Sequence, residues 1–207
     1  MWKDISAPWR AAFEEAWEAF RAGSVPIGAA LCDASGTILL RDRNRSNEAD
    51  TVNRRISHAE ANLLRRLDTS VGDLYSLTLY TTMEPCPMCM GTAVMAGIRH
   101  LRSAARDPYC GMVHLAETEP YYEEKHLDFT FEGGEVELVQ LTVQSYRELR
   151  YVDSGASPKV LDKFEAYMPN AVAAARELYA AKELDRLADA DTDAGEVFDR
   201  ILEKVQI

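Results

Sequence analysis

Two short motifs, each expected at the first turn of a helix, constrain how this chain can fold. One reads His-Ala-Glu at 58–60, and the other reads Pro-Cys-Pro-Met-Cys at 85–89, directly after a strand-like run at 77–82. A C-x-x-C pair around the first turn of a helix directs both sulfurs toward one point. The free N–H groups at that helix end stabilise thiolates. The fold must therefore bring two helix N-termini into one cleft if the histidine is to share that point.

The side chains of His58, Cys86 and Cys89 make a zinc-ligand set. Zinc favours nitrogen and thiolate ligands in a tetrahedron, and three protein ligands leave the fourth position open to water, as in catalytic sites. Zinc makes such a water acidic enough to furnish hydroxide near neutral pH. Glu60 lies two residues from His58 on the same turn and can carry protons from that water to a ring nitrogen and to the departing amine. The pattern predicts Zn2+ as the cofactor and Glu60 as the catalytic acid and base.

Each motif alone has a simpler explanation. A C-x-x-C pair also suits structural zinc or redox chemistry, and Glu60 also suits a capping box with Ser57 as the N-cap. However, structural zinc usually takes a fourth Cys or His, and the chain has no second C-x-x-C. A thioredoxin-like redox pair needs no His-x-Glu. The joint pattern is the signature of zinc-dependent deaminases that act on nucleobases.

Composition limits the partners and the compartment. The 207 residues suit one α/β domain with an appendage. There is no apolar run of about 18 residues and no leader-like N-terminus, so we expect no membrane partner and a reducing, cytoplasmic location. In that setting Cys32, which lies in an apolar run, is expected to be a core residue. The net charge of −11 favours a small molecule over a polyanion such as RNA.

Hydrophobic periodicity and turn residues predict the following elements. Before the second motif we expect a helix at 8–22, a hairpin of strands at 27–32 and 37–40, a loop at 41–55, a helix from Ser57 to Leu67 and a strand at 77–82. Beyond it we expect a helix at 87–96, a strand at 100–105, a helix at 114–126, a strand at 136–141 and helices from 143 onward. This division places one domain at 1–157 and a C-terminal helical extension at 158–207.

Together these features resemble the cytidine and nucleobase deaminase superfamily over about residues 8–150. The residues that carry the resemblance are Pro26-Ile27-Gly28-Ala29, Asn44-Arg45, His58-Ala59-Glu60, Thr82-Met83-Glu84-Pro85-Cys86-Pro87-Met88-Cys89 and Ala105-Arg106-Asp107. The chain is most similar to the tRNA adenosine deaminase and guanine deaminase branches. The resemblance implies an α/β fold, a three-layer α/β/α cytidine-deaminase-like domain around a mixed five-stranded sheet, and a homodimer. It offers no counterpart for the C-terminal helical appendage.

The resemblance also implies roles for single positions. His58, Cys86 and Cys89 match the zinc ligands, and Glu60 matches the proton shuttle. Two further positions match substrate-binding groups: Asn44, whose counterpart hydrogen-bonds the base, and Ala59, whose backbone N–H would line the base pocket. Asn44 also suits a turn.

Six other positions have less defined roles. The small residues at 28–29 are expected where a flat ring approaches the backbone. Glu84 is interpreted as a structural carboxylate. Arg106, Asp107 and Tyr109 are candidates either for substrate contact or for loop packing.

One segment departs from the tRNA-acting relatives. Where they resemble Lys-Thr-Gly-Ala-Ala-Gly-Ser, this chain reads Pro-Tyr-Cys-Gly-Met-Val-His at 108–114, so the basic character is lost. The sequence therefore predicts a zinc-dependent hydrolytic deaminase of a free nucleobase or nucleoside, preferably a small purine such as guanine or adenine. The alternative is a tRNA-specific adenosine deaminase, which would use the same chemistry on a flipped base. A non-catalytic zinc-stabilised module is the third possibility, and the retained Glu60 argues against it.

Overall fold

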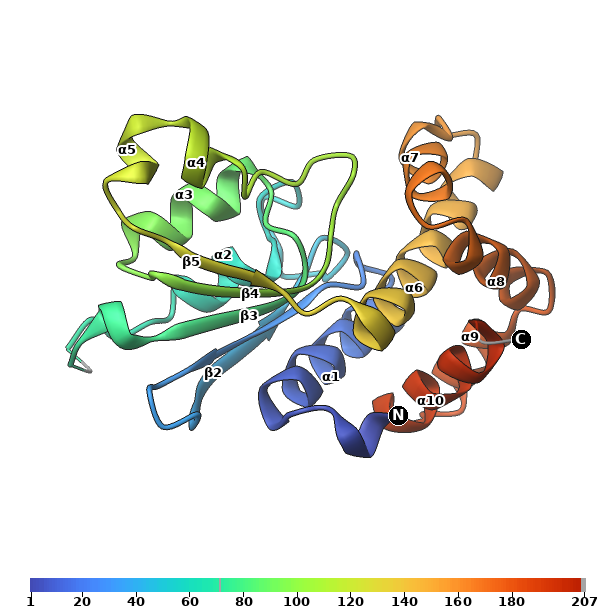
Figure 1. Cartoon of the computed structure of the whole chain (residues 1–207). Coiled ribbons are helices and arrows are strands. Elements are labelled where there is room, and N and C mark those ends of the chain that lie inside the picture. The colour runs from blue at the N-terminus through green and yellow to red at the C-terminus, as the bar shows by residue number, and fades with distance from the viewer. Residues whose placement is uncertain (71, 206–207) are drawn as a thin grey trace.

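A five-stranded sheet forms the centre of the computed structural model, which describes residues 1–70 and 72–205 (Figure 1). The strands are β1 (Gly28–Cys32), β2 (Ile38–Arg43), β3 (Thr78–Met83), β4 (His100–Ala105) and β5 (Asp128–Phe131). They lie in the order β2-β1-β3-β4-β5. Strand β1 pairs antiparallel with β2 and β3, whereas β3, β4 and β5 are mutually parallel neighbours. The expected mixed five-stranded sheet is confirmed.

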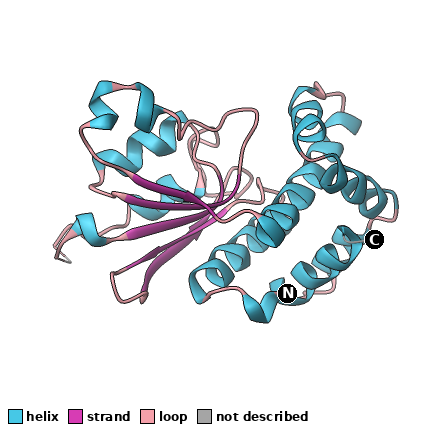
Figure 2. Cartoon of the chain, in the orientation of Figure 1, coloured by secondary structure: helices cyan, strands magenta, loops and turns pink. Residues whose placement is uncertain are grey.

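Helices cover both faces of this sheet (Figure 2). They are α1 (Ala7–Arg21), α2 (Ala59–Leu64), α3 (Pro87–Met95), α4 (Leu115–Thr118), α5 (Pro120–Glu123), α6 (Gly134–Asp153), α7 (Lys159–Tyr167), α8 (Pro169–Ala180), α9 (Glu183–Asp189) and α10 (Ala194–Val205). Helices α2 and α3 lie on one face, and α1 and α6 lie on the other (Figure 1). Within the described residues, no helix combines the length and the apolarity that crossing a bilayer requires.

The C-terminal helices extend the core on the α1 and α6 face. Buried side chains of α8 and α10, such as Val172 and Phe198, belong to the same apolar cluster as those of α1 and α6. The rings of Phe198 and Phe13 pack edge to face with their centroids 5.2 Å apart. Residues 159–205 therefore lie on the body of the protein as a further helical layer, and the expected C-terminal helical appendage is present.

The predicted strand at 136–141 is wrong, because this segment lies inside α6. The apolar residues Val136, Val139, Val143 and Tyr146 are all buried and recur every three or four positions, which is helical spacing. The short run to 141 contained too few positions to separate this period from strand alternation. The fifth strand is instead β5, which ends at Phe131, two residues before the pair Gly133-Gly134.

The helix predicted at 114–126 is two short helices, α4 and α5. Pro120 is the first residue of α5, and a proline disfavours helical conformation in the residue before it. Glu119 accordingly has extended backbone angles, and the chain turns there.

The predicted N-cap at Ser57 is also wrong. Helix α2 begins one residue later, with His58 as its N-cap, and ends at Leu64 rather than near Leu67. The Ser57 hydroxyl donates a hydrogen bond to Oδ1 of Asn62 instead of capping the helix. Glu60 makes no capping bond, so its carboxylate is free to turn into the core.

Gly28 lets α1 lie directly against β1. A Cβ atom at this position would sit 2.0 Å from the Ala12 carbonyl oxygen and 2.5 Å from the Ala16 nitrogen. Both are backbone atoms of α1 and cannot move aside cheaply. The small residue at 28 is therefore explained by helix packing, rather than by the approach of a flat ring that the sequence suggested.

Gly28→Ala should destabilise the protein strongly, because the methyl group would force α1 off the sheet. We expect a loss of at least about 3 kcal/mol in the free energy of unfolding, as for severe overpacking. The matched control is Gly91→Ala in α3, where the nearest atom to an added Cβ is the Tyr122 hydroxyl at 3.6 Å. That variant should be neutral or gain up to about 1 kcal/mol of helix propensity. Urea denaturation measures both, and equal stabilities for the two variants would contradict the packing argument.

Candidate metal and active site

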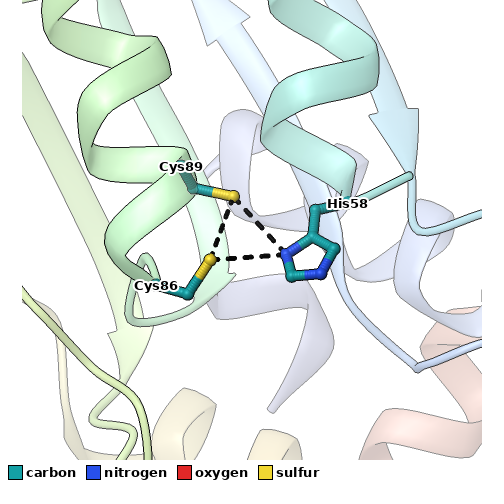
Figure 3. Close-up of side chains that lie close together, drawn as sticks. All are labelled: His58, Cys86 and Cys89. Carbon is teal, nitrogen blue, oxygen red and sulfur yellow. Dashed lines mark hydrogen bonds between the residues drawn. The ribbon is translucent and has the colours of Figure 1, made fainter. Parts of the chain in front are cut away.

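The N-termini of α2 and α3 point at the same place, beside the carboxyl end of β3. Helix α2 precedes β3 in the chain, and α3 follows it. His58 is the N-cap of α2, Cys86 is the N-cap of α3, and Cys89 lies in the first turn of α3. Strand β3 ends at Met83, only three residues before Cys86, and this connection is too short for α3 to start anywhere else. Figure 3 shows the three side chains turned toward one another from the two helices.

The three potential ligand atoms form a nearly equilateral triangle. Nδ1 of His58 lies 3.5 Å from Sγ of Cys86 and 3.5 Å from Sγ of Cys89, and the two sulfurs are 3.6 Å apart. A tetrahedral zinc ion with its usual bond lengths would place two sulfurs about 3.8 Å apart, and sulfur and nitrogen about 3.6 Å apart. Among the described residues, these three make the one group of His, Cys, Asp or Glu side chains close enough to share an ion. The residues therefore fit zinc.

Proximity shifts the protonation of all three groups. The hydrogen bond from Cys89 lowers the pKa of Cys86 to about 4 against the opposing effect of burial, and His58 lowers it further. The hydrogen bond to Cys86 and burial both raise the pKa of Cys89. The hydrogen bond to Cys86 raises the pKa of His58, while burial lowers it. Cys86 is therefore the more acidic of the two thiols, and a bound cation would displace the protons that these groups share.

Glu60 is buried beside this triangle, on the second residue of α2. Only 3% of its surface is exposed, and burial raises its pKa, which the charge of His58 partly offsets. Its Oε1 accepts a hydrogen bond from the Thr81 hydroxyl at 3.2 Å, and its Oε2 lies 3.3 Å from Sγ of Cys89. A carboxyl group whose pKa is raised in this way holds a proton more readily than one in water, as suits a group that takes up and releases protons.

Asn44 lies at the same edge of the sheet as the carboxyl end of β3 and the ligand triangle. It directly follows β2, and its backbone N–H donates to the Ile27 carbonyl just before β1. Its side-chain Oδ1 accepts the Ser46 N–H at 2.9 Å, so Asn44 does form the turn that its residue type suits. Its Nδ2 donates to no other group of the described chain. Ala59 is fully buried as the first residue of α2, where the backbone N–H has no partner within the helix.

The loop at 106–113 borders the triangle and is organised by Glu84. The Glu84 carboxylate accepts backbone N–H groups of Asp107 and Val113 at 3.1 and 3.2 Å. A Cβ at Gly111 would lie 2.3 Å from the Glu84 carboxyl carbon, so a larger residue there would displace the carboxylate from these N–H groups. These contacts agree with the interpretation of Glu84 as a structural carboxylate. The importance of Gly111 had no signal in the sequence, since it depends on how closely the loop approaches Glu84.

The same loop is close to the metal-ligand positions. The Met112 N–H donates to the Pro85 carbonyl, next to Cys86. Burial raises the pKa of the Cys110 thiol, and the charges of Asp107, Cys86 and Glu60 raise it further. Asp107 accepts backbone N–H groups of Tyr109 and Cys110 and so stabilises the loop itself.

Comparisons with known proteins agree with this geometry. A family model described as the cytidine and deoxycytidylate deaminase zinc-binding region matches residues 3–104. The chain is 33% identical over 148 residues to the tRNA-specific adenosine deaminase of Agrobacterium fabrum, which covers 69% of this chain and 93% of that protein. It is 38% identical over 102 residues to the tRNA-specific adenosine deaminase of Bacillus subtilis, which covers 48% of this chain and 61% of that enzyme. The chain spans less than two thirds of the length of several curated relatives that it matches.

A solved structure gives the same result. The chain superposes on a structure from studies of A-to-I editing by tRNA:A34 deaminases with a TM-score of 0.50 and 33% sequence identity, covering 60% of this chain and 94% of that one. The family match contains His58, Cys86 and Cys89, whose ligand atoms have the spacing that zinc requires. The chain therefore belongs to the family of the cytidine and deoxycytidylate deaminases, which has a zinc-binding region and the mixed-sheet fold described above.

Proposed function

We propose that this protein is a zinc-dependent hydrolytic deaminase that releases ammonia from a nucleobase ring. The observation that carries the proposal is the buried Glu60 carboxylate, 3.3 Å from Sγ of Cys89 and turned toward a ligand triangle of zinc dimensions. A metal site that served only to hold the fold together would gain nothing from a buried carboxylate at this point. A hydrolytic site needs one to move protons.

In this proposal His58, Cys86 and Cys89 hold the zinc. When bound, zinc supplies Lewis-acid activation of a water molecule. Glu60 accepts one proton from the attacking water at the carboxylate oxygen that faces Cys89 and delivers it to the ring nitrogen. It then takes the remaining proton from the hydroxyl group added to the ring carbon and delivers it to the departing amine, so that the C–N bond breaks, ammonia leaves and a carbonyl remains. The Thr81 hydroxyl, bonded to the other oxygen, holds the carboxylate in this orientation.

Substrate recognition is assigned to groups at the same sheet edge. Asn44 keeps Oδ1 in its turn and offers Nδ2 to a ring acceptor. The backbone N–H of Ala59, which as the first residue of α2 has no partner within the helix, offers a second donor at the positive end of the helix. These two donors suit the carbonyl oxygens and unprotonated nitrogens of a nucleobase.

The preferred substrate that we propose is a free purine-type base, such as guanine or adenine, or its nucleoside. The net charge of −11 and the absence of basic residues from the segment at 108–113 both disfavour a polyanion. A tRNA substrate is the second candidate, because three relatives of at least 33% identity are tRNA-specific adenosine deaminases. Both candidates use the same Glu60 and the same metal ligands.

We further propose that residues 1–157 form the deaminase domain, that 158–207 form its extension, and that the protein acts as a cytoplasmic homodimer. The outer side of α3 supports dimer formation, because Met95 is 75% exposed there beside the 58% exposed Tyr75. Light scattering decides the oligomeric state. A solution mass equal to the 23.2 kDa of one chain would exclude the dimer.

Substitutions at Glu60 and Cys89 should fail in different ways. Glu60→Gln keeps the size and polarity of the side chain but cannot shuttle protons, so zinc should stay bound while kcat falls by at least about a hundredfold. Cys89→Ala removes a ligand and should lose both zinc and activity. Cys32→Ala, a buried control in β1, should keep both. Elemental analysis and ammonia release measure these outcomes, and a fully active Glu60→Gln enzyme would overturn the proposed mechanism.

Asn44→Asp should weaken substrate binding without loss of zinc. The variant keeps the oxygen that accepts the Ser46 N–H but loses the Nδ2 donor, so we expect kcat/KM to fall by about tenfold or more. Asn53→Asp is a matched control, because Asn53 also accepts a backbone N–H two residues on, from Arg55, and is exposed. Equal kcat/KM values for the two variants would remove Asn44 from the binding site.

A substrate panel separates the two candidate functions. Zinc-loaded protein should release ammonia from guanine, adenine or one of their nucleosides, and should not shift tRNA in a gel at low salt. Turnover of adenosine in tRNA together with salt-sensitive binding would instead establish the second candidate. If neither free bases, nucleosides nor tRNA were deaminated, the proposed function would be refuted.

A further inference from the structure

The loop at 106–113 is held from outside the zinc site by two later helices. The Arg106 N–H, at the start of the loop, donates to Oε1 of Glu137 at 3.1 Å. The same oxygen accepts the hydroxyl of Tyr167 at 2.8 Å. Glu137 lies in the first turn of α6 and Tyr167 is the last residue of α7. One carboxylate oxygen therefore joins the C-terminal extension to the loop that borders the metal ligands.

A second contact connects the other end of α7 with the middle of this loop. Nζ of Lys159, the first residue of α7, lies 5.4 Å from the centre of the Tyr109 ring. The loop is therefore connected to both ends of α7. In Figure 1 the loop that follows β4 extends toward α7. The two contacts are independent, because one runs through a hydrogen-bonded carboxylate and the other through a cation and an aromatic ring.

The Tyr167 hydroxyl is a donor at all ordinary pH values, although 39% of the side chain is exposed. Partial burial raises the pKa of Tyr167 to about 12, and the hydrogen bond to Glu137 contributes in the same direction. Glu137 itself is only 9% exposed. A hydrogen bond to a buried carboxylate is among the stronger kinds, so the connection holds the loop firmly.

We propose that α7 braces the loop at 106–113 against the zinc site, and that Glu137 and Tyr167 are positioning residues for substrate binding. The inference rests on the proposed deaminase function. Glu60 and the metal ligands lie on α2 and α3, which the brace does not contact through these residues. Fixing the loop in advance lowers the ordering cost of binding and leaves the chemical step unchanged. The brace therefore acts on KM rather than on kcat.

Tyr167→Phe tests the brace by removing one hydroxyl. We expect amide hydrogen exchange across 106–113 to become about tenfold faster, because a hydrogen bond to a charged group is lost. With the best substrate from the panel, KM should rise by about fivefold or more while kcat stays within about twofold. Tyr179→Phe is the matched control, since it removes a hydroxyl of the extension that bonds Asp153 at the end of α6 and not the loop. It should change neither exchange in the loop nor KM.

Glu137 provides a rescue test. Glu137→Gln retains an acceptor oxygen and should keep loop exchange within about threefold of wild type, whereas Glu137→Ala should reproduce the effect of Tyr167→Phe. Unchanged exchange in both Tyr167→Phe and Glu137→Ala would overturn the brace, and faster exchange with unchanged KM would overturn its role in substrate binding. If the wild-type protein turns over no substrate, the proposed function fails. Loop exchange alone then decides the brace, which unchanged exchange overturns and faster exchange supports.

Discussion

The convergence of two helix N-termini on one point is the constraint on which the rest of this structure depends. Three ligand atoms lie 3.5 to 3.6 Å apart at that point, and all three belong to partly or fully buried side chains. Such a group is costly to bury unless its members share protons or a cation. The parallel pairing of β3 and β4 places α3 where its first turn faces α2. The sheet is thus the support that keeps two short helices aimed at each other.

Two glutamates near this point, the buried Glu60 and the half-buried Glu84, show how environment decides the role of a carboxylate. Burial raises the pKa of both Glu60 and Glu84. Glu84 accepts two backbone N–H groups of the neighbouring loop, so its oxygens are committed to structure. Glu60 is held by a single hydroxyl on one oxygen and has a thiol beside the other. Only Glu60 keeps an oxygen available for proton transfer at the metal triangle.

The C-terminal helices have a closer relation to the site than a separate appendage would. Helices α8 and α10 complete an apolar cluster with α1 and α6, while α7 reaches the loop beside the zinc ligands. A buried core transmits small displacements because it is densely packed. In the brace that we propose, changes in this extension alter substrate binding without touching a catalytic group.

The sequence by itself determined the metal triangle and most of the sheet, because these depend on local spacing: two residues between cysteines, one between His58 and Glu60, and alternating strands between turns. It was wrong about the segment at 136–141 and about Ser57, where a few residues suited two local structures and packing selected between them. Only the tertiary structure decided why Gly28 is small, and only it joined Arg106 to Glu137 and Tyr167. Those groups are separated by about 30 residues along the chain, and no local pattern records which side chains meet when helices pack.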